Sequence, residues 1–392
     1  MERIFDLGVL YSTEGSYAAL GQQGLAGARM AIDEVNASPD YGFSFRAEIA
    51  DPRGRFDRYG PMCDALVRPG RVRHVIGGIT SWSRKEVIPV VEKHEARLWY
   101  ACPYEGFEAN DHVFYLGACP NQHVLPLFAH AFETFGTRPF LVGSNYIWGW
   151  ENNRIARELV THGGGEVAGE RCLPLGDTDV GRLIAEIRET RPDFVLNNLI
   201  GPSSYAFLRA YHALAQEDAA FLPERRPVLS CNLTELELDI VGPAAIGHIA
   251  TASYFDSIPT GENRAFLGRV AARLGPKQRV SAFFVGAYSA VLLLAEAIRR
   301  TGTDDPAAID AVAAECRPIL PMGPLALDPL TKHAVLTPWL GRAVPGGRFE
   351  LLEETGRIVM PDPYMASPLQ DVRGLGDPTS RASQAPRLRL VQ

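Results

Sequence analysis

The sequence lacks the short motifs that mark several common catalytic, nucleotide-binding and metal-binding sites. It contains no G-x-S-x-G, no H-E-x-x-H and no P-loop pattern, and its six cysteines include no C-x-x-C pair. These absences argue against serine hydrolases of that type, zinc peptidases, P-loop nucleotidases and thiol-based metal or redox centres. Cys102 is conceivable as a nucleophile, but no histidine or glutamate is evident to activate it. We therefore expect a protein that is not an enzyme and has no metal and no cofactor.

The sequence also lacks an excess of positive charge and a hydrophobic run long enough to cross a bilayer. Lys and Arg number 39 against 46 Asp and Glu, a net charge of -7, which disfavours direct binding to nucleic acid or to anionic lipid. The apolar run 282–295 ends at Glu296, short of the ~20 residues that span a membrane. We expect a buried helix there and no membrane insertion.

The start of the chain carries no recognisable leader. It enters a β-like run at Ile4 without a charged segment followed by an apolar one, as an export signal would require. We therefore expect a cytoplasmic protein, or a periplasmic one if an export signal has been removed.

Short apolar runs alternate with amphipathic helical patterns along almost the whole chain. With 392 residues, about two domains are expected, and the alternation is typical of repeated β-α units around parallel sheets. We predict an α/β fold of two doubly wound, Rossmann-like lobes joined by a three-strand hinge, with the third crossing near 321–328. The predicted division is 1–119 plus 252–325 for lobe one, 120–251 plus 326–364 for lobe two, and 365–392 for a mobile tail.

Two segments of the first lobe combine polar residues with the ends of predicted strands. Gly77–Lys85 follows one strand, with Ser83 as the expected N-cap of the next helix, and Tyr100–Phe107 follows another. The carboxyl ends of parallel strands share one sheet edge, where α/β proteins bind small ligands, and free N–H groups at a helix start suit an anion or a carbonyl oxygen. This pattern indicates a binding cleft.

The motifs in and after these segments resemble a known superfamily. They are Ser81, Arg84-Lys85-x-Val87-x-Pro89-Val90, Tyr100-x-x-Pro103-Tyr104-Glu105-Gly106, Pro120-Asn121-Gln122, Gly143-Ser144-x-Tyr146, Gly201 with Ser203-Ser204, 253–258 and 361–364. Together they resemble the type I periplasmic binding proteins, and within these the amide- and urea-binding branch that contains the aliphatic amidase expression-regulating proteins. The resemblance implies a Venus-flytrap fold that closes on a small molecule.

The resemblance also implies where the ligand binds. It places Ser81, Tyr100 and Cys102 on the wall of lobe one, and Tyr146 and Trp148 on the wall of lobe two. The chain departs from the branch at two of these positions, because Cys102 stands where threonine is usual and Trp148 where the amide regulators have tyrosine. The further candidate ligand-binding residues are Ser83, Pro103, Ser203 and Asn232.

Several of these residues also fit ordinary structural roles. Ser81 suits a helix start, Tyr100 suits the core and Asn232 suits a turn, whereas Arg84 and Lys85 are expected to reach solvent or glutamates on the lobe surface. A carbonyl amide needs hydrogen-bond donors, acceptors and an apolar wall, and Ser81 could supply a donor as well as an acceptor.

The sequence leaves two functions open. The first is a sensor that closes on a short aliphatic amide or urea-like ligand and regulates a protein partner, such as an RNA-binding antiterminator. The second is the substrate-binding receptor of an ABC transporter for amides, urea or branched-chain amino acids, with an ABC permease as partner. An amino-acid ligand would need charged partners, for which Glu105, Glu151 and Glu235 are near enough to cleft positions in the sequence.

Overall fold

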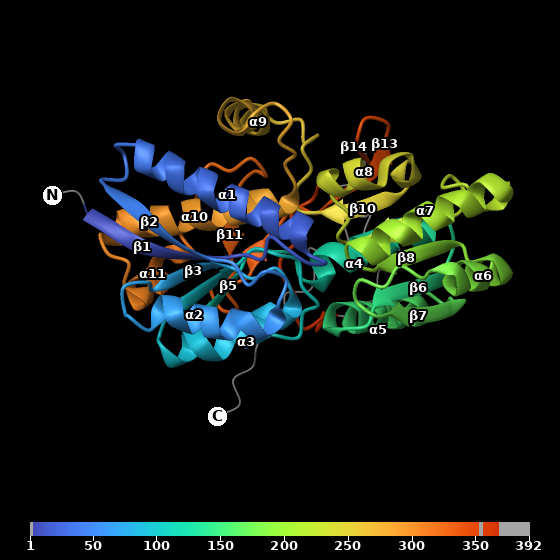
Figure 1. Ribbon diagram of the computed structural model, residues 1–392, viewed down its shortest axis with the longest axis horizontal. Coiled ribbons are helices and arrows are strands. Elements are labelled where there is room, and N and C mark those ends of the chain that lie inside the picture. Colours follow the sequence, from blue (N-terminus) through green and yellow to red (C-terminus); the bar gives the residue numbers. More distant parts are fainter. Residues whose placement is uncertain (1–2, 353–355, 368–392) are drawn as a thin grey trace, which may run out of the picture.

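The structure, a computed structural model, describes residues 3–352 and 356–367. Two β-sheets, each with helices on both faces, form two lobes that lie side by side (Figure 1). The predicted tail from residue 368 onward lies outside the described residues.

Sheet one contains five parallel strands in the order β2-β1-β3-β4-β5. Its strands are β1 (Arg3–Leu10), β2 (Phe43–Ala50), β3 (His74–Gly77), β4 (Arg97–Tyr100) and β5 (Val113–Tyr115). The helices of this lobe are α1 (Ala18–Ala37), α2 (Tyr59–Val67), α3 (Ser81–Lys93), α10 (Ala282–Thr301) and α11 (Pro306–Ala313). Helices α1 and α10 pack together, and α2 and α3 lie on the opposite face (Figure 1).

Sheet two contains seven strands in the order β14-β13-β10-β9-β8-β6-β7. Its parallel strands are β6 (Pro139–Ser144), β7 (Gly169–Leu173), β8 (Phe194–Asn198), β9 (Val228–Ser230) and β10 (Ile249–Ala252); β13 (Trp339–Val344) and β14 (Arg348–Leu351) are added antiparallel. Its helices are α4 (Pro120–Thr134), α5 (Ile147–His162), α6 (Gly181–Thr190), α7 (Pro202–Glu217) and α8 (Glu235–Val241).

Helix α9 (Gly261–Leu274) packs on lobe one, where Phe266 contacts the rings of Phe284 and Tyr288 of α10. The remaining elements are short. They are the two-stranded pair β11 (Ala326–Leu327) and β12 (Ala334–Val335), and three 3-10 turns at Phe56–Arg58, Ala219–Phe221 and Gly242–Ala245.

Alternating side chains of the central strands fill the space on both faces of sheet two. In β6, Phe140 and Val142 join the cluster that includes Phe207 of α7, whereas Leu141 joins the other cluster with Phe128 of α4. Successive strand residues point to opposite faces, and both faces of a parallel sheet are covered by helices. This explains why such strands are continuous apolar runs in the sequence.

Helix α10 is the buried helix predicted from the apolar run 282–295. It is long and apolar enough to cross a membrane, but 83% of its apolar window is buried inside the protein. It approaches α1 so closely that a Cβ atom added at Gly27 would lie 2.1 Å from the carbonyl oxygen of Phe284. The run therefore builds the core of lobe one.

The predicted fold class, α/β with two lobes, is confirmed. The third crossing lies later in the chain than 321–328, because His333 still pairs beside Tyr115 at the edge of sheet one, and Trp339 is the first residue of β13 in sheet two. The residue boundaries given for the two lobes stay a prediction.

Candidate functional site

The predicted site residues follow the carboxyl ends of strands in both sheets. Ser81 follows β3, Cys102 follows β4, Tyr146 and Trp148 follow β6, Ser203 follows β8, and Asn232 follows β9, while Tyr100 ends β4. All of them are buried. The structure therefore gathers these side chains at the inner edges of the two sheets, as a cleft between lobes requires.

The start of α3 is capped by Thr80, so the prediction that Ser83 is the N-cap is wrong. The Thr80 hydroxyl accepts from the backbone N–H of Ser83 at 2.9 Å, and the Ser83 hydroxyl accepts from the N–H of Thr80 at 3.0 Å. This reciprocal pair is a capping box with serine in its third position. The Ser83 hydroxyl also accepts from the Ile79 N–H and donates to the Thr80 carbonyl. Its hydrogen bonds therefore all go to the backbone at the start of α3.

Arg84 reaches glutamates, as one of the two expected alternatives, but it does so at the centre of a buried charge cluster and not on the lobe surface. Its side chain has 0% exposure and donates to Glu105 at 2.8 Å and to Glu108 at 2.7 Å. Its guanidinium lies between the rings of Tyr100 and Tyr104, 4.9 Å and 4.7 Å from their centroids, a geometry that favours a cation. Two carboxylates thus face one buried guanidinium.

The second carboxylate of this cluster is held from several sides. Glu108 accepts from the Tyr115 hydroxyl at 2.8 Å and from the ammonium of half-exposed Lys85 at 3.0 Å. Burial raises the pKa of Glu108, but Arg84 and Lys85 outweigh it and lower the pKa to about 2. The same carboxylates hold the pKa of Arg84 above its ordinary value in spite of burial. Lys85 does reach a glutamate, as predicted.

Cys102 is positioned as a structural thiol. Its Sγ donates to the carbonyl of Gly78 at 3.3 Å, and burial raises the pKa of the thiol well above its ordinary value. A thiolate is the reactive form of cysteine, so this environment suppresses nucleophilic chemistry. Pro103, which follows it, is partly buried, and a Cβ at Gly117 would lie 1.9 Å from the Cys102 carbonyl oxygen. The loop is thus tightly packed.

The wall from lobe two combines aromatic rings with unpaired polar atoms. The Trp148 Nε1 and the Ser203 Oγ are buried and have no hydrogen-bond partner among the described residues. Asn232 differs from them, because its amide contacts the Leu199 carbonyl at 3.3 Å and the Ser230 hydroxyl at 2.7 Å. Asn232 thus stabilises its own loop, as a turn residue would.

Two further residues belong to the cleft and were missed in the sequence. Tyr17 follows β1, and its ring packs edge-on against that of Tyr146 with centroids 6.1 Å apart. His123 of α4 lies 5.5 Å from the Trp148 ring, and its Nε2 lies 3.0 Å from the Tyr104 carbonyl while Nδ1 has no partner among the described residues. The loop after β1 lies at the same sheet edge as Ser81, which is the signal that could have identified Tyr17.

The two lobes are in contact in this structure. Beyond the Tyr17 and Tyr146 rings, a Cβ at Gly201 would lie 2.1 Å from the Ser16 carbonyl oxygen. On the rim, the Arg154 guanidinium of α5 lies 4.5 Å from the ring centroid of Phe107, which follows β4. The strand ends of the two lobes are therefore in direct contact.

The Arg154 contact is expected to favour closure. A cation over an aromatic ring at an exposed site contributes about 0.5–1 kcal/mol, so Arg154→Ala should shift the open–closed equilibrium two- to fivefold toward open. Small-angle X-ray scattering of the ligand-free protein would show this as a larger radius of gyration. Arg157→Ala is the matched control, because Arg157 pairs with Glu170 of the same lobe; equal profiles for both variants would contradict the role.

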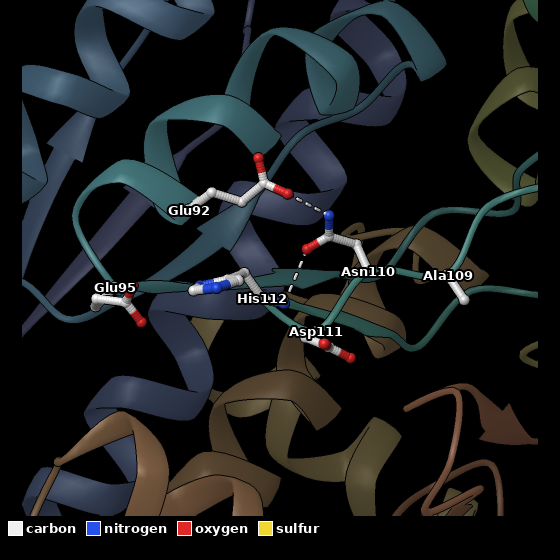
Figure 2. Close-up of a pocket in the computed structure, with 6 residues that line it drawn as sticks. All are labelled: Glu92, Glu95, Ala109, Asn110, Asp111 and His112. Atoms are coloured by element: carbon white, nitrogen blue, oxygen red, sulfur yellow. Dashed lines mark hydrogen bonds between the residues drawn. The ribbon is translucent and has the colours of Figure 1, made fainter.

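Two hollows on lobe one contain none of the predicted site residues. One, of about 470 Å³, is lined by Glu92, Glu95, Ala109, Asn110, Asp111 and His112 (Figure 2). Its side chains partly satisfy one another, since Asn110 donates to Glu92 at 2.7 Å and accepts from the His112 N–H. A second, of about 500 Å³, lies beside Trp82. The convergent strand ends, and not these open hollows, mark the candidate site.

Comparison with known proteins supports a binding role. The model of the family described as "Periplasmic binding protein domain" matches residues 5–369. Curated relatives include Leu/Ile/Val-binding protein homolog 6 of Brucella abortus, 28% identical over 199 residues, and its counterpart in Brucella suis, 27% identical; each match covers 49% of this chain and 49% of the relative. The match thus spans about half the length of these relatives.

Solved structures share the fold over nearly the whole chain. A solute-binding protein of an ABC transporter from Rhodopseudomonas palustris, in complex with benzoate, has a TM-score of 0.80 at 19% identity and covers 92% of this chain and 98% of its own. A leucine-binding protein from Thermotoga maritima has a TM-score of 0.76 at 15% identity, covering 91% and 99%. At such identities the similarity shows the fold alone.

These comparisons refine the expectations from the sequence. The family consists of ligand-binding proteins and not enzymes, as predicted, whereas the amide-regulator branch finds no specific support. The family acts in the periplasm where its members are exported, and the cytoplasmic location expected above is not supported. The chain belongs to the type I periplasmic binding protein family and is similar to the leucine/isoleucine/valine-binding proteins.

Proposed function

We propose that the protein is the solute-binding receptor of an ABC transporter and that its ligand is a small neutral molecule of the amide or urea type. The observation that carries the proposal is a group of buried polar atoms near the inner sheet edges that have no hydrogen-bond partner among the described residues, among them the Trp148 Nε1, the Ser203 Oγ and the His123 Nδ1. Buried polar groups in native proteins are nearly always hydrogen-bonded. A bound polar ligand would satisfy these atoms.

The size of the ligand follows from the closeness of the lobes. The Tyr17 and Tyr146 rings contact across the cleft, and burial raises the pKa of both hydroxyls above their ordinary values. A ligand enclosed beside these rings must be compact. Because it contacts both lobes, it would stabilise the closed state and be recognised through closure.

The charge of the ligand follows from the Arg84 cluster. Two cations, Arg84 and Lys85, face two carboxylates, Glu105 and Glu108, so the local charge is balanced. The Arg84 Nη1 has no partner among the described residues, but its charge is already offset. A carboxylate ligand would need an additional cation, which favours a neutral solute over benzoate or an amino acid.

A sensor that regulates a protein partner is the second candidate. The segment Pro103–Glu108, with its resemblance to the amide regulators, favours it. An RNA-binding antiterminator as the partner would then replace an ABC permease. The two candidates share a ligand and differ in the partner protein that binds the closed state. Co-purification of the native partner with and without ligand therefore distinguishes them.

The ligand class can be tested by thermal unfolding against a panel of solutes. The panel contains acetamide, butyramide, urea, formamide, benzoate, 4-hydroxybenzoate, leucine and valine. A solute present at about 100 times its Kd should stabilise the protein by ~2.7 kcal/mol. We expect the largest increase in Tm from an amide or urea; an increase with leucine or benzoate alone would overturn the assignment, and titration calorimetry would check each hit.

A further inference from the structure

The Ser81 hydroxyl already has a partner inside the protein. Its Oγ lies in hydrogen-bonding contact with Glu105 Oε2, and both side chains are buried. The other carboxylate oxygen, Oε1, accepts from Arg84 at 2.8 Å. A carboxylate paired with a guanidinium is only an acceptor, so the single proton of the Ser81 hydroxyl points to Glu105.

The position of Glu105 is fixed by its surroundings. Arg84, which holds Glu105, is itself held by Glu108 through Nε and by the rings of Tyr100 and Tyr104 on either side. If Glu105 rotated away, the buried guanidinium of Arg84 would lose one of its two carboxylate partners, which is energetically unfavourable. Glu105 therefore keeps the Ser81 hydroxyl in one orientation in the free and in the bound protein.

We propose that Glu105 is a specificity-determining positioning residue, which acts through Ser81 and makes it a hydrogen-bond acceptor toward the ligand. Ser81 then takes an N–H from the ligand and leaves a lone pair facing any ligand that has only an acceptor there. This inference rests on the proposed function, because it assumes that the cleft binds a small polar solute, and it corrects the expectation that Ser81 serves equally as a donor.

The selectivity follows from hydrogen-bond matching. A solute with an NH2 group satisfies Ser81, whereas its oxygen or methyl counterpart leaves the Ser81 lone pairs facing a lone pair or an apolar group in a buried site. Leaving one buried polar group unsatisfied in this way lowers affinity by about 10- to 100-fold. The expected order is amide above the matched ketone or carboxylate.

The test compares matched solutes by titration calorimetry on the full chain. The pairs are acetamide with acetone, acetamide with acetate, and benzamide with benzoate, and the measured quantity is the ratio of the two Kd values in each pair. The wild-type protein should bind the amide 10- to 100-fold more tightly. Tighter binding of acetate or benzoate would overturn the inference and leave a solute-binding function standing, whereas no binding of any solute tested would overturn the proposed function and the inference with it.

Glu105→Gln provides the decisive variant. Its amide oxygen would take the place facing Arg84, so its NH2 group would face Ser81 and release the serine proton toward the ligand. The preference for the amide should then fall at least tenfold or reverse. A merely structural role of Glu105 would weaken both members of a pair equally and leave the ratio unchanged, which would overturn the inference.

Two further variants keep the test interpretable. Glu108→Gln is the matched control, because Glu108 contacts the same guanidinium but not Ser81; it should alter stability and leave the ratio for the uncharged pair, acetamide with acetone, as in the wild type. Ser81→Ala removes the hydroxyl without changing a charge. If Glu105→Gln does not fold, this variant still tests whether the preference for the amide depends on the Ser81 hydroxyl. The ratio for acetamide with acetone should approach one in Ser81→Ala, and a ratio equal to that of the wild type would contradict the proposal.

Discussion

Replacing Arg84 with methionine is expected to destabilise the protein by about 3–5 kcal/mol, because it leaves Glu105 and Glu108 buried without their shared cation. Methionine retains the apolar stem between the Tyr100 and Tyr104 rings, so the loss reflects charge and hydrogen bonds more than volume. The measurement is the free energy of unfolding from urea denaturation, followed by circular dichroism at pH 7.

Lys85→Met is the control for this prediction. Lys85 pairs with the same Glu108, but its side chain is 46% exposed, and an ion pair at the surface contributes about 0–1 kcal/mol. The two variants remove one charge each from neighbouring positions of α3. Equal losses of stability would show that burial of Arg84 does not govern the cluster.

Gly27→Ala should cost about 3 kcal/mol by forcing apart the two helices at the centre of lobe one. The new methyl group would lie 2.1 Å from the Phe284 carbonyl oxygen, a backbone atom that cannot rotate away. Alanine has the higher helix propensity by about 1 kcal/mol, so the loss occurs against an intrinsic gain. Urea denaturation measures the net effect.

Gly268→Ala is the control that shows the effect of helix propensity without the packing clash expected in Gly27→Ala. Gly268 is also inside a helix, α9, but it is exposed, and a Cβ added there meets no atom within 4 Å. This variant should gain about 0.5–1 kcal/mol. If Gly27→Ala were stabilising as well, α1 and α10 would have room that the structure does not show.

Much of the fold was predictable because its signals are local. The alternation of apolar runs with amphipathic patterns predicted the repeated β-α units of both sheets, and the apolar run 282–295 predicted the buried helix that is found as α10 at Ala282–Thr301. The N-cap of α3 was harder to predict, because both Thr80 and Ser83 are good capping residues and only the backbone geometry decides between them. The third crossing was misplaced because a short strand pair precedes it.

The site was predictable in outline and not in its chemistry. Topology brings Ser81 and Tyr100 to the inner edge of sheet one and Tyr146 to the inner edge of sheet two, since each of them follows or ends a strand there. The burial of Arg84 was not predictable, because an arginine in the first turn of a helix is usually exposed and its partners lie 21 and 24 residues away. The roles proposed for Glu105 and Ser81 depend on the pairing of Arg84 with Glu105, so they could not be predicted from the sequence either.

The two antiparallel strands added to sheet two have a consequence for synthesis of the chain. Strand β10 pairs with β13 through residues 249–252 and 339–342, so its outer edge has no partner until the chain has been made as far as β13. An uncovered strand edge can pair with another chain, and incompletely folded proteins aggregate through such edges. The last part of the fold to be translated therefore protects lobe two from misassembly on the ribosome.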